Sequence, residues 1–355
     1  MKIAARSTDV EFRGVTRNFG NVIAVDAISF HIASGTLVTL LGPSGCGKTT
    51  TLRMIAGLEM PTAGAILIGG RDVSKLPATE RDVSMVFQSY ALFPHMNVIE
   101  NVGYGLAVGP GSKSEKRDKA IEGLKLVGLD GYEDRMPSEL SGGQQQRVAV
   151  ARALVLEPSV LLFDEPLSNL DAKLRRRMRE EIRELQQTLG LTAVYVTHDQ
   201  EEALAVSDRI IVMSQAKIAQ SGTPAELYDL PETRFVADFI GGANLVACEI
   251  IGTEGPLARI RLGPTELRLP HRGIPQGAGH LAIRPNAIRL THEVAPGQIA
   301  ADVRKATYLG SHIEYTLATE LGELFAVDPA TDTPFKAGAS ARITFAPRGL
   351  ALVRD

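Results

Sequence analysis

Eight residues, Gly42 to Thr49, have the types and spacing of a phosphate-binding loop. The run Gly-Pro-Ser-Gly-Cys-Gly-Lys-Thr matches G-x-x-x-x-G-K-[ST], and it joins a strand pattern at 36–41 to a helix pattern at 47–56. Glycines let backbone N–H groups turn toward a phosphate, and the helix N-terminus adds positive potential. Lys48 brings a mobile charge and Thr49 a hydroxyl for Mg²⁺. We therefore expect a triphosphate site over Gly42, Pro43, Ser44, Gly45, Cys46, Gly47, Lys48, Thr49 and Thr50.

Two acidic residues follow a short apolar run at 160–163. Asp164 and Glu165 would emerge at the carboxyl end of a buried strand, where ligands bind in open α/β sheets. Asp164 suits the Mg²⁺ hydration shell, and Glu165 suits proton acceptance from water. A solvated acidic turn is the alternative, which the phosphate loop disfavours.

A third motif lies between these two. In Leu140-Ser-Gly-Gly-Gln-Gln-Gln-Arg147, Ser141 is placed to cap a helix and Gln144 stands three residues later, as in a capping box. Gly142 and Gly143 would leave the first N–H groups uncovered, although each glycine weakens a helix by about 1 kcal/mol. This pattern predicts a second anion-binding helix N-terminus without a lysine.

Strand and helix patterns alternate through the first 240 residues. Strands are expected at 10–32 (with a turn near Gly20), 36–41, 84–87, 160–163, 192–196 and 210–213, and helices at 47–56, 115–127, 143–156, 172–189 and 200–206. Such alternation predicts a parallel sheet covered by helices, an α/β phosphate-loop NTPase, with a helical subdomain at about 89–158.

A different pattern follows Gly241-Gly242. Short alternating segments separated by Gly, Pro and Asn occupy 241–355 and predict an all-β barrel or sandwich. Residues 225–240 are expected to be helical with a break at Pro231. We therefore divide the chain into domains 1–240 and 241–355.

Composition excludes several other classes of protein. The chain has 355 residues, 44% hydrophobic and 22% charged, which is typical of globular domains. The net charge of −3 argues against a nucleic-acid partner, and two cysteines are too few for a disulfide framework. The N-terminus lacks an apolar signal-peptide core, and no run approaches the roughly 20 apolar residues that span a bilayer.

The combination of phosphate loop, LSGGQ and LLFDEP resembles the ATP-binding subunits of ABC transporters. The resemblance implies a homodimer that holds two ATP molecules head to tail. The loop of one copy would then face Ser141, Gly142, Gly143 and Gln144 of the other.

The resemblance also implies roles for residues outside these motifs. Phe19 would stack on adenine, Gln88 would sense Mg²⁺ and the attacking water, and His198 would contact the γ-phosphate. Asp171, in Ser168-Asn-Leu-Asp171, would link the two sites. Each has an alternative: a core aromatic for Phe19, a solvated strand end for Gln88, a structural histidine for His198 and a helix N-cap for Asp171. The expected catalytic set is Glu165, His198, Gln88 and Lys48, and the expected metal set is Thr49, Gln88 and Asp164.

A basic run follows Asp171. Lys173, Arg175, Arg176, Arg177, Arg179 and Arg183 interleave at helical spacing with Glu180, Glu181 and Glu184. We expect this to be a solvated helix face.

Further segments resemble importers of small solutes. The stretch 87–106 resembles the segment that contacts a permease subunit, with an apolar anchor at Tyr90, Leu92, Phe93 and Pro94. LAIRPNAIRL and YLGSHIEYTLA resemble the oligomer-binding-fold repeats of regulatory and dimerisation domains. The implied partners are two integral membrane permease subunits, which would contact the region after Gln88. A periplasmic solute-binding protein would be an indirect partner. The implied location is the cytoplasmic face of a bacterial inner membrane.

The resemblance predicts ATP hydrolysis that drives solute import. The sequence contains no solute contact, and 2-aminoethylphosphonate is the first expectation from overall resemblance, followed by polyamine and iron(III). Two alternatives remain, a soluble ABC ATPase without a transport role and a ligand-sensing regulator.

Overall fold

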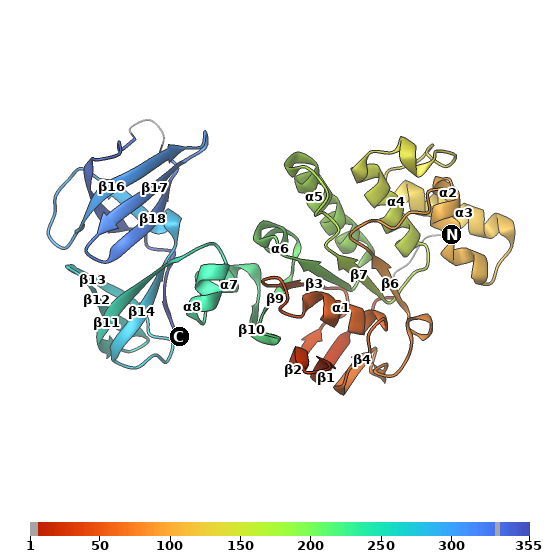
Figure 1. The fold of residues 1–355 in the computed structure, drawn as a ribbon, viewed down its shortest axis with the longest axis horizontal. Coiled ribbons are helices and arrows are strands. Elements are labelled where there is room, and N and C mark those ends of the chain that lie inside the picture. Colours follow the sequence, from red (N-terminus) through yellow and green to blue (C-terminus); the bar gives the residue numbers. More distant parts are fainter. Residues whose placement is uncertain (1–5, 331–333) are drawn as a thin grey trace. The chain divides into compact units, whose positions relative to one another are not determined.

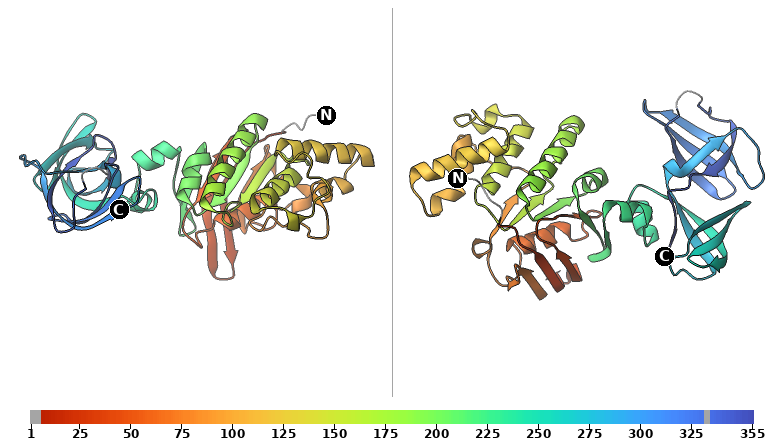
Figure 2. Two further views of the ribbon diagram at one scale, coloured as in Figure 1. Left: turned by 90° about the horizontal axis from the view of Figure 1, so that it is seen from above. Right: turned by 180° about the vertical axis from the view of Figure 1, so that it is seen from behind.

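The computed structural model describes residues 6–330 and 334–355. The chain forms two compact units, the first ending at Pro224 and the second beginning at Ala225. In Figures 1 and 2 the first unit runs from red to green and the second from green to blue.

The first unit is organised around a sheet of six described strands. Their order is β10–β9–β3–β8–β7–β6, and all neighbours are parallel except β10 and β9. The bounds are β3 Leu37–Leu41, β6 Val83–Val86, β7 Val160–Asp164, β8 Ala193–Thr197, β9 Arg209–Ser214 and β10 Lys217–Gly222. The expected strands at 36–41, 84–87, 160–163, 192–196 and 210–213 are confirmed to within two residues.

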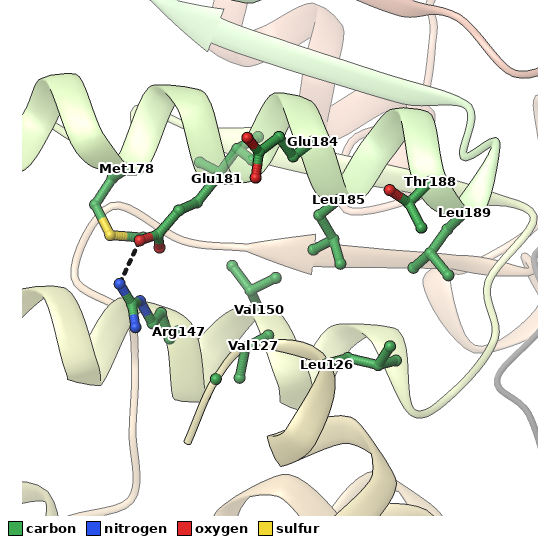
Figure 3. A pocket seen from close by; sticks show the side chains of 12 residues that line it. Leu126, Val127, Arg147, Val150, Met178, Glu181, Glu184, Leu185, Thr188 and Leu189 are labelled. Carbon is green, nitrogen blue, oxygen red and sulfur yellow. Dashed lines mark hydrogen bonds and ion pairs between the residues drawn. The ribbon is translucent and has the colours of Figure 1, made fainter. Parts of the chain in front are cut away.

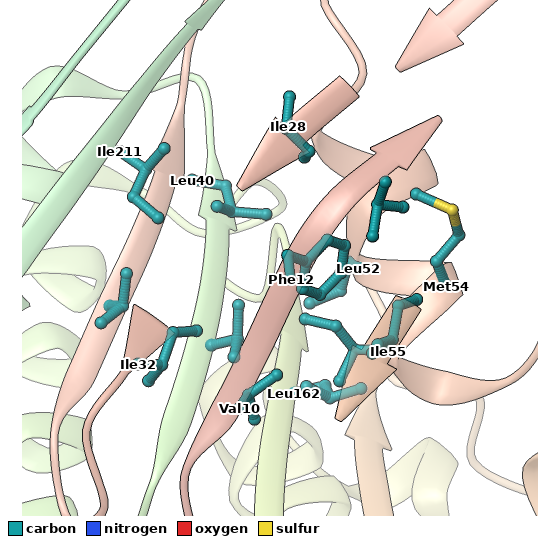
Figure 4. Packing of buried hydrophobic residues seen from close by; sticks show 14 of the residues in the cluster. Val10, Phe12, Ile28, Ile32, Leu40, Leu52, Met54, Ile55, Leu162 and Ile211 are labelled. Atoms are coloured by element: carbon teal, nitrogen blue, oxygen red, sulfur yellow. The ribbon is translucent and has the colours of Figure 1, made fainter. Parts of the chain in front are cut away.

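Alternate residues of the central strands face two different cores. Val160 and Leu162 of β7 pack with α1 (Lys48–Ala56) and an antiparallel sheet, whereas Leu161 and Phe163 pack with α4 (Gly142–Leu154) and α5 (Ala172–Leu189). Burial on both faces explains why these strands are continuous apolar runs. Figure 4 shows the first core, where Phe12, Leu40, Leu52 and Ile55 meet.

The antiparallel sheet has the order β2–β1–β4–β5. Its bounds are β1 Val10–Phe19, β2 Val22–Ile32, β4 Ala63–Ile68 and β5 Arg71–Asp72. The turn at Gly20 agrees with the expected hairpin, whereas β4 and β5 were not predicted. Leu67 of β4 pairs with Glu11 of β1 on one side and with Asp72 of the adjacent β5 on the other. Pairing with β1, which is distant in sequence, therefore adds to what the local pattern provides.

The helices between residues 89 and 158 share an apolar core. Val98, Val102, Leu124 and Val148 are buried together. The helices are α2 Val98–Gly103, α3 Lys113–Leu126 and α4, and α4 also packs against the central sheet through Ala149 and Ala153. The remaining helix of this unit is α6 Gln200–Val206, and 3-10 turns lie at Ala78–Glu80, Gly105–Val108 and Pro137–Glu139.

The second unit contains two five-stranded antiparallel sheets among its described residues. Their orders are β13–β12–β11–β14–β20 and β15–β19–β16–β17–β18. The bounds are β11 Asn244–Glu254, β12 Leu257–Leu262, β13 Thr265–Pro270, β14 Gly277–Ile283, β15 Ile288–Thr291, β16 Ile299–Tyr308, β17 Ile313–Thr319, β18 Gly322–Asp328, β19 Ser340–Phe345 and β20 Leu350–Val353, with a 3-10 turn at Pro285–Ala287. One core joins both sheets, as expected for a small all-β domain.

The division between the units differs from the predicted boundary after residue 240. Helices α7 (Pro224–Asp229) and α8 (Arg234–Phe239) belong to the second unit, apart from the first residue of α7. The buried Arg284 donates from Nη1 to the Ala237 carbonyl (2.8 Å) and from Nε to the Tyr228 carbonyl (3.0 Å), which ties both helices to the β-domain. Helical patterning suggested continuity with the first domain, but tertiary hydrogen bonds decide otherwise.

None of the helices in residues 6–330 and 334–355 is long and apolar enough to cross a membrane.

Candidate functional site

Four of the expected motifs converge at one edge of the central sheet. Because β3, β6, β7 and β8 are parallel, the segments after their carboxyl ends share that edge. The phosphate loop follows β3, Gln88 follows β6, Asp164 and Glu165 end β7, and His198 follows β8.

The loop conformation requires glycine at two positions. Gly47 has φ +105°, and a Cβ there would lie 2.5 Å from the Ala24 carbonyl oxygen. A Cβ on Gly42 would lie 2.3 Å from the Met213 carbonyl oxygen. No larger residue fits without moving backbone, so the loop presents main chain to a ligand.

Lys48 is buried, and its ammonium lies inside the loop. Nζ donates to the carbonyl oxygens of Gly42 (2.7 Å) and Pro43 (2.9 Å). The first N–H groups of α1 also open onto the loop, because they have no acceptor within the helix. A cation and a helix N-terminus therefore converge on one concavity, which suits a polyphosphate.

Asp164 and Glu165 differ in environment although they are adjacent. Burial raises the pKa of the Asp164 carboxyl, Arg53 opposes the shift, and Glu165 adds to it. Glu165 has φ +45°, and its N–H donates to the Val196 carbonyl at 3.0 Å. Its Oε2 lies 3.0 Å from Nδ1 of His198, whose ring is 60% exposed. The ring of His198 is therefore accessible at the surface as well as paired with Glu165.

The expected metal ligands have suitable chemistry. Thr49 is half-buried in the first turn of α1, which packs against β7, the strand that ends at Asp164. A hydroxyl and a carboxylate are hard oxygen ligands of the kind Mg²⁺ prefers. Gln88 is exposed, and its main-chain carbonyl accepts from Nδ2 of Asn169 at 3.1 Å. The segment that contains Gln88 therefore touches the Ser168–Asp171 loop. The residues present therefore fit a magnesium–nucleotide complex.

The helix start at Ser141 has the expected capping box. The Gln144 N–H donates to Ser141 Oγ (3.4 Å), and the Ser141 N–H donates to Gln144 Oε1 (2.9 Å). The glycines have a packing role that the sequence did not reveal, because a Cβ on Gly143 would lie 2.9 Å from Leu174 Cδ1. Within the described residues, no hydrogen bond joins Ser141–Gln144 to the phosphate loop of the same chain.

Phe19 and Asp171 are placed at the periphery. Phe19 is 44% exposed at the end of β1, with the Arg17 guanidinium 4.4 Å from its ring centre, so the core-aromatic alternative is wrong. Asp171 accepts from the Leu174 N–H at 3.0 Å, and the N-cap interpretation is confirmed. The cap does not preclude a second role for its carboxylate.

The prediction of a solvated basic face on α5 is only partly correct. Arg176 and Arg177 are exposed and pair with Glu180 and Glu181 at i,i+4 spacing. In contrast, Arg175 and Arg183 are about one-quarter to one-third exposed and bind residues of other elements. Helical spacing shows which residues share a face of α5, but it does not show that residues 199–208 contact part of that face.

The expected apolar anchor is also revised. Tyr90 is buried, and Arg152 donates to its carbonyl (2.8 Å) and to that of Ala91 (2.7 Å). A groove of about 450 Å³ lies beside this segment, lined by Leu58, Phe87, Phe93, Tyr104 and Leu156 among others. The apolar surface is therefore supplied by several elements, not by the 90–94 run alone.

A second hollow of about 330 Å³ separates α4 and α5 (Figure 3). Val150, Met178 and Leu185 line it, and Arg147 pairs with Glu181 at one end. It contains none of the predicted site residues.

Comparisons with protein families match both units. The ABC transporter model matches residues 25–168, and the TOBE domain model matches residues 281–353. The first match includes the phosphate loop, the Ser141 motif and Glu165, but not Phe19 or His198.

Curated relatives match almost the full length. The "Fe(3+) ions import ATP-binding protein FbpC" of Brucella abortus (strain 2308) is 60% identical over 352 residues, which cover 99% of each chain. The protein of that name in Rhizobium etli is 60% identical over 346 residues, or 97% of each chain.

Solved structures agree with the fold of the first unit. A dimeric ATP-binding cassette in a post-hydrolysis state with ADP and Pi has a TM-score of 0.54 and 33% identity, covering 61% of this chain and 98% of that one. The cbiO1 protein of Clostridium perfringens, part of an ABC transporter complex, has a TM-score of 0.58 and 28% identity, covering 62% and 90%.

Proposed function

The chain belongs to the ATP-binding proteins of ABC transporters with a C-terminal TOBE domain, and from this premise we propose that it hydrolyses ATP to drive the import of iron(III). The observation that carries the choice of solute is 60% identity over 99% of a protein named for import of Fe(3+) ions. This favours iron(III) over 2-aminoethylphosphonate, the first expectation from sequence resemblance.

The proposed chemistry is in-line attack of water on the γ-phosphate of ATP. Glu165 accepts the proton of the attacking water, and His198, 3.0 Å away, orients that carboxylate and contacts the γ-phosphate. Lys48 exchanges its loop carbonyl partners for phosphate oxygens. The developing negative charge is thus met by groups already in place.

Thr49, Asp164 and Gln88 are proposed to hold Mg²⁺, partly through water. When bound, this ion neutralises charge on the phosphate oxygens. Phe19 would stack on the adenine ring, which its exposed position permits.

The active species is proposed to be a homodimer. Ser141, Gly142, Gly143 and Gln144 would complete the site of the second copy, since the signature helix has no hydrogen bond to its own loop in the described residues. Asp171, beside this helix, would link the two sites. A related cassette has been solved as a dimer, which supports this arrangement.

The proposed partners are two permease subunits, which the 450 Å³ groove after Gln88 would contact, and a solute-binding protein that delivers iron(III) to them. The chain would then lie at the cytoplasmic face of the cell membrane. The β-domain would supply dimer contacts and regulation.

Uptake of labelled iron(III) tests this proposal. A strain deleted for the gene should lose uptake, regain it with the wild-type chain and not with Glu165→Gln, while uptake of labelled 2-aminoethylphosphonate and polyamine stays unchanged. Loss of either of those solutes instead would refute the choice of iron(III). If uptake of all three solutes were unchanged, the soluble ATPase or the ligand-sensing regulator would be favoured.

A further inference from the structure

Arg175 joins two loops that are distant in sequence. It lies in the first turn of α5, and its Nη2 donates to the Leu170 carbonyl at 3.1 Å. Its Nη1 donates to Asp199 Oδ2 at 3.4 Å, and its Nε lies 3.6 Å from Glu202 Oε1. One planar guanidinium therefore spans the Ser168–Asp171 loop and the segment that follows His198.

The segment after His198 is held from both sides by the same network. The Asp199 N–H donates to Thr197 Oγ1 (3.0 Å), and Thr197 Oγ1 donates to Glu202 Oε2 (2.8 Å). Asp199 Oδ1 also accepts from the Glu202 N–H at 3.1 Å and caps α6. His198 thus lies between Thr197 and Asp199, and both of these neighbours are hydrogen-bonded to Glu202.

Glu202 is a buried carboxyl beside Arg175. It is 3% exposed, and its Oε2 accepts from the hydroxyls of Tyr195 and Thr197. Burial raises the pKa of this carboxyl, Asp199 adds to the shift, and the hydrogen bonds and Arg175 oppose it. Arg175 offsets part of this shift, so removing its charge would raise the pKa of Glu202 further and would break the ion pair that ties α5 to this turn.

The network is continuous with the catalytic pair. A small cavity of about 50 Å³ is lined by Glu165, Ser168, Arg175, His198 and Asp199, together with Thr197 and Glu202. Ser168 Oγ also donates to the Glu165 carbonyl at 3.1 Å. The loop that follows Glu165 and the turn that carries His198 therefore meet at Arg175.

We infer that Arg175 is a positioning residue that holds the Ser168–Asp171 loop and the His198 turn together, and so sets the contact between His198 and Glu165. This inference rests on the roles proposed above for Glu165 and His198. A displacement of about 1 Å at reacting groups can cost roughly 100-fold in rate. Because the linked loop includes Asp171, Arg175 would also transmit its movement to His198 when the second copy binds.

The test compares steady-state ATP hydrolysis and nucleotide binding in full-length variants. Arg175→Gln should lower kcat by roughly 10-fold or more while KM for ATP changes less than about twofold, because a positioning residue acts on the catalytic pair and not on ATP binding. Arg175→Lys should recover only part of the loss, since an ammonium cannot reproduce the planar fork. Arg176→Gln and Arg176→Lys are matched controls on an exposed neighbour and should stay within about twofold of wild type.

A double-mutant cycle tests whether Arg175 acts through Asp199, and the melting temperature separates this effect from a loss of folding. If Arg175 acts through Asp199, the kcat losses of Arg175→Gln and Asp199→Asn should be clearly less than additive. The melting temperature identifies misfolded variants; should Arg175→Gln misfold, the cycle is run with Arg175→Lys. Normal kcat in both Arg175 variants, a KM that rises as kcat falls, or additive losses would each overturn the inference.

The Glu165→Gln variant is measured in the same series. Normal hydrolysis by that variant would remove the proposed function of the site. An inactive Glu165→Gln beside a fully active Arg175→Gln would remove only the role of Arg175.

Discussion

Glu165 and His198 come from different strands and meet at the carboxyl edge of the central sheet, with Oε2 and Nδ1 3.0 Å apart. Glu165 reaches this position through a positive φ and a backbone hydrogen bond to Val196 on β8. The backbone of Glu165 is therefore held by β8, the strand that precedes the histidine. This contact is the basis for assigning them to one reaction step.

Replacement of Glu165 by glutamine is expected to preserve ATP binding and lower turnover by about 100-fold or more, because an amide cannot accept the proton. Nucleotide titration and phosphate release measure the two effects, and the ATP-bound dimer should accumulate. Glu201→Gln is the control, since that side chain is 86% exposed. Wild-type hydrolysis by Glu165→Gln would exclude Glu165 as the proton acceptor.

Ser141→Arg is expected to block hydrolysis by placing bulk and charge where the γ-phosphate of the second copy would lie. Lys48→Ala should also be inactive, because it removes the phosphate-binding cation. Mixed dimers of the two variants contain one site free of both defects, so mixing them should restore part of the activity.

The matched control for the lost helix cap is Ser112→Arg. Ser112 caps α3 with the same capping-box geometry, and its loss should cost about 1 kcal/mol of helix stability without blocking hydrolysis. Normal activity of Ser141→Arg alone, or no recovery on mixing folded variants, would contradict the head-to-tail arrangement.

Chains ending at Pro224 and at Ile240 are expected to differ. Both should bind ATP, because the motif residues precede Pro224. Both should also dimerise less than the full chain in the absence of nucleotide, because the β-domain is missing. The longer chain should aggregate more, because α7 and α8 lose their hydrogen bonds from Arg284 and α8 loses its packing against Ala282 and Val353.

Sedimentation velocity and nucleotide titration of the two truncations provide the measurement. Failure of the folded Pro224 chain to bind ATP would show that the first unit extends beyond this residue. Unchanged dimerisation of both would exclude the C-terminal unit as a dimer contact.

Asp208→Asn is expected to destabilise the first unit at neutral pH. Burial alone would raise the pKa of Asp208, but hydrogen bonds from Arg183 and the Leu37 N–H outweigh it and hold the pKa below the ordinary value of 3.8. A carboxyl with a lowered pKa contributes stability that is fully present above pH 3.8, its ordinary pKa. That contribution is lost as the pH falls through the pKa of the folded state.

Urea unfolding followed by circular dichroism tests this pH dependence. The difference in unfolding free energy between wild type and Asp208→Asn should shrink as the pH falls below 3.8. Asp130→Asn, 71% exposed, should show little difference at any pH. A difference independent of pH would mean that the Asp208 charge contributes nothing.

The sequence by itself determined the elements and motifs that depend on local pattern. Apolar runs bounded by glycine located β3 and β7, the Ser141 capping box located the start of α4, and the phosphate loop was recognisable from its spacing. These features involve residues a few positions apart, whose conformations follow from burial, capping and glycine geometry.

Only the tertiary structure decided which side chains meet. It buried Tyr90, moved α7 and α8 into the second unit through Arg284, and turned Arg175 from a surface charge into a bridge between Leu170 and Asp199. A helical pattern reports which residues share a face but not which distant segment covers it. The partners of Arg175 lie on a separate loop and on α6, and no local spacing could have identified them.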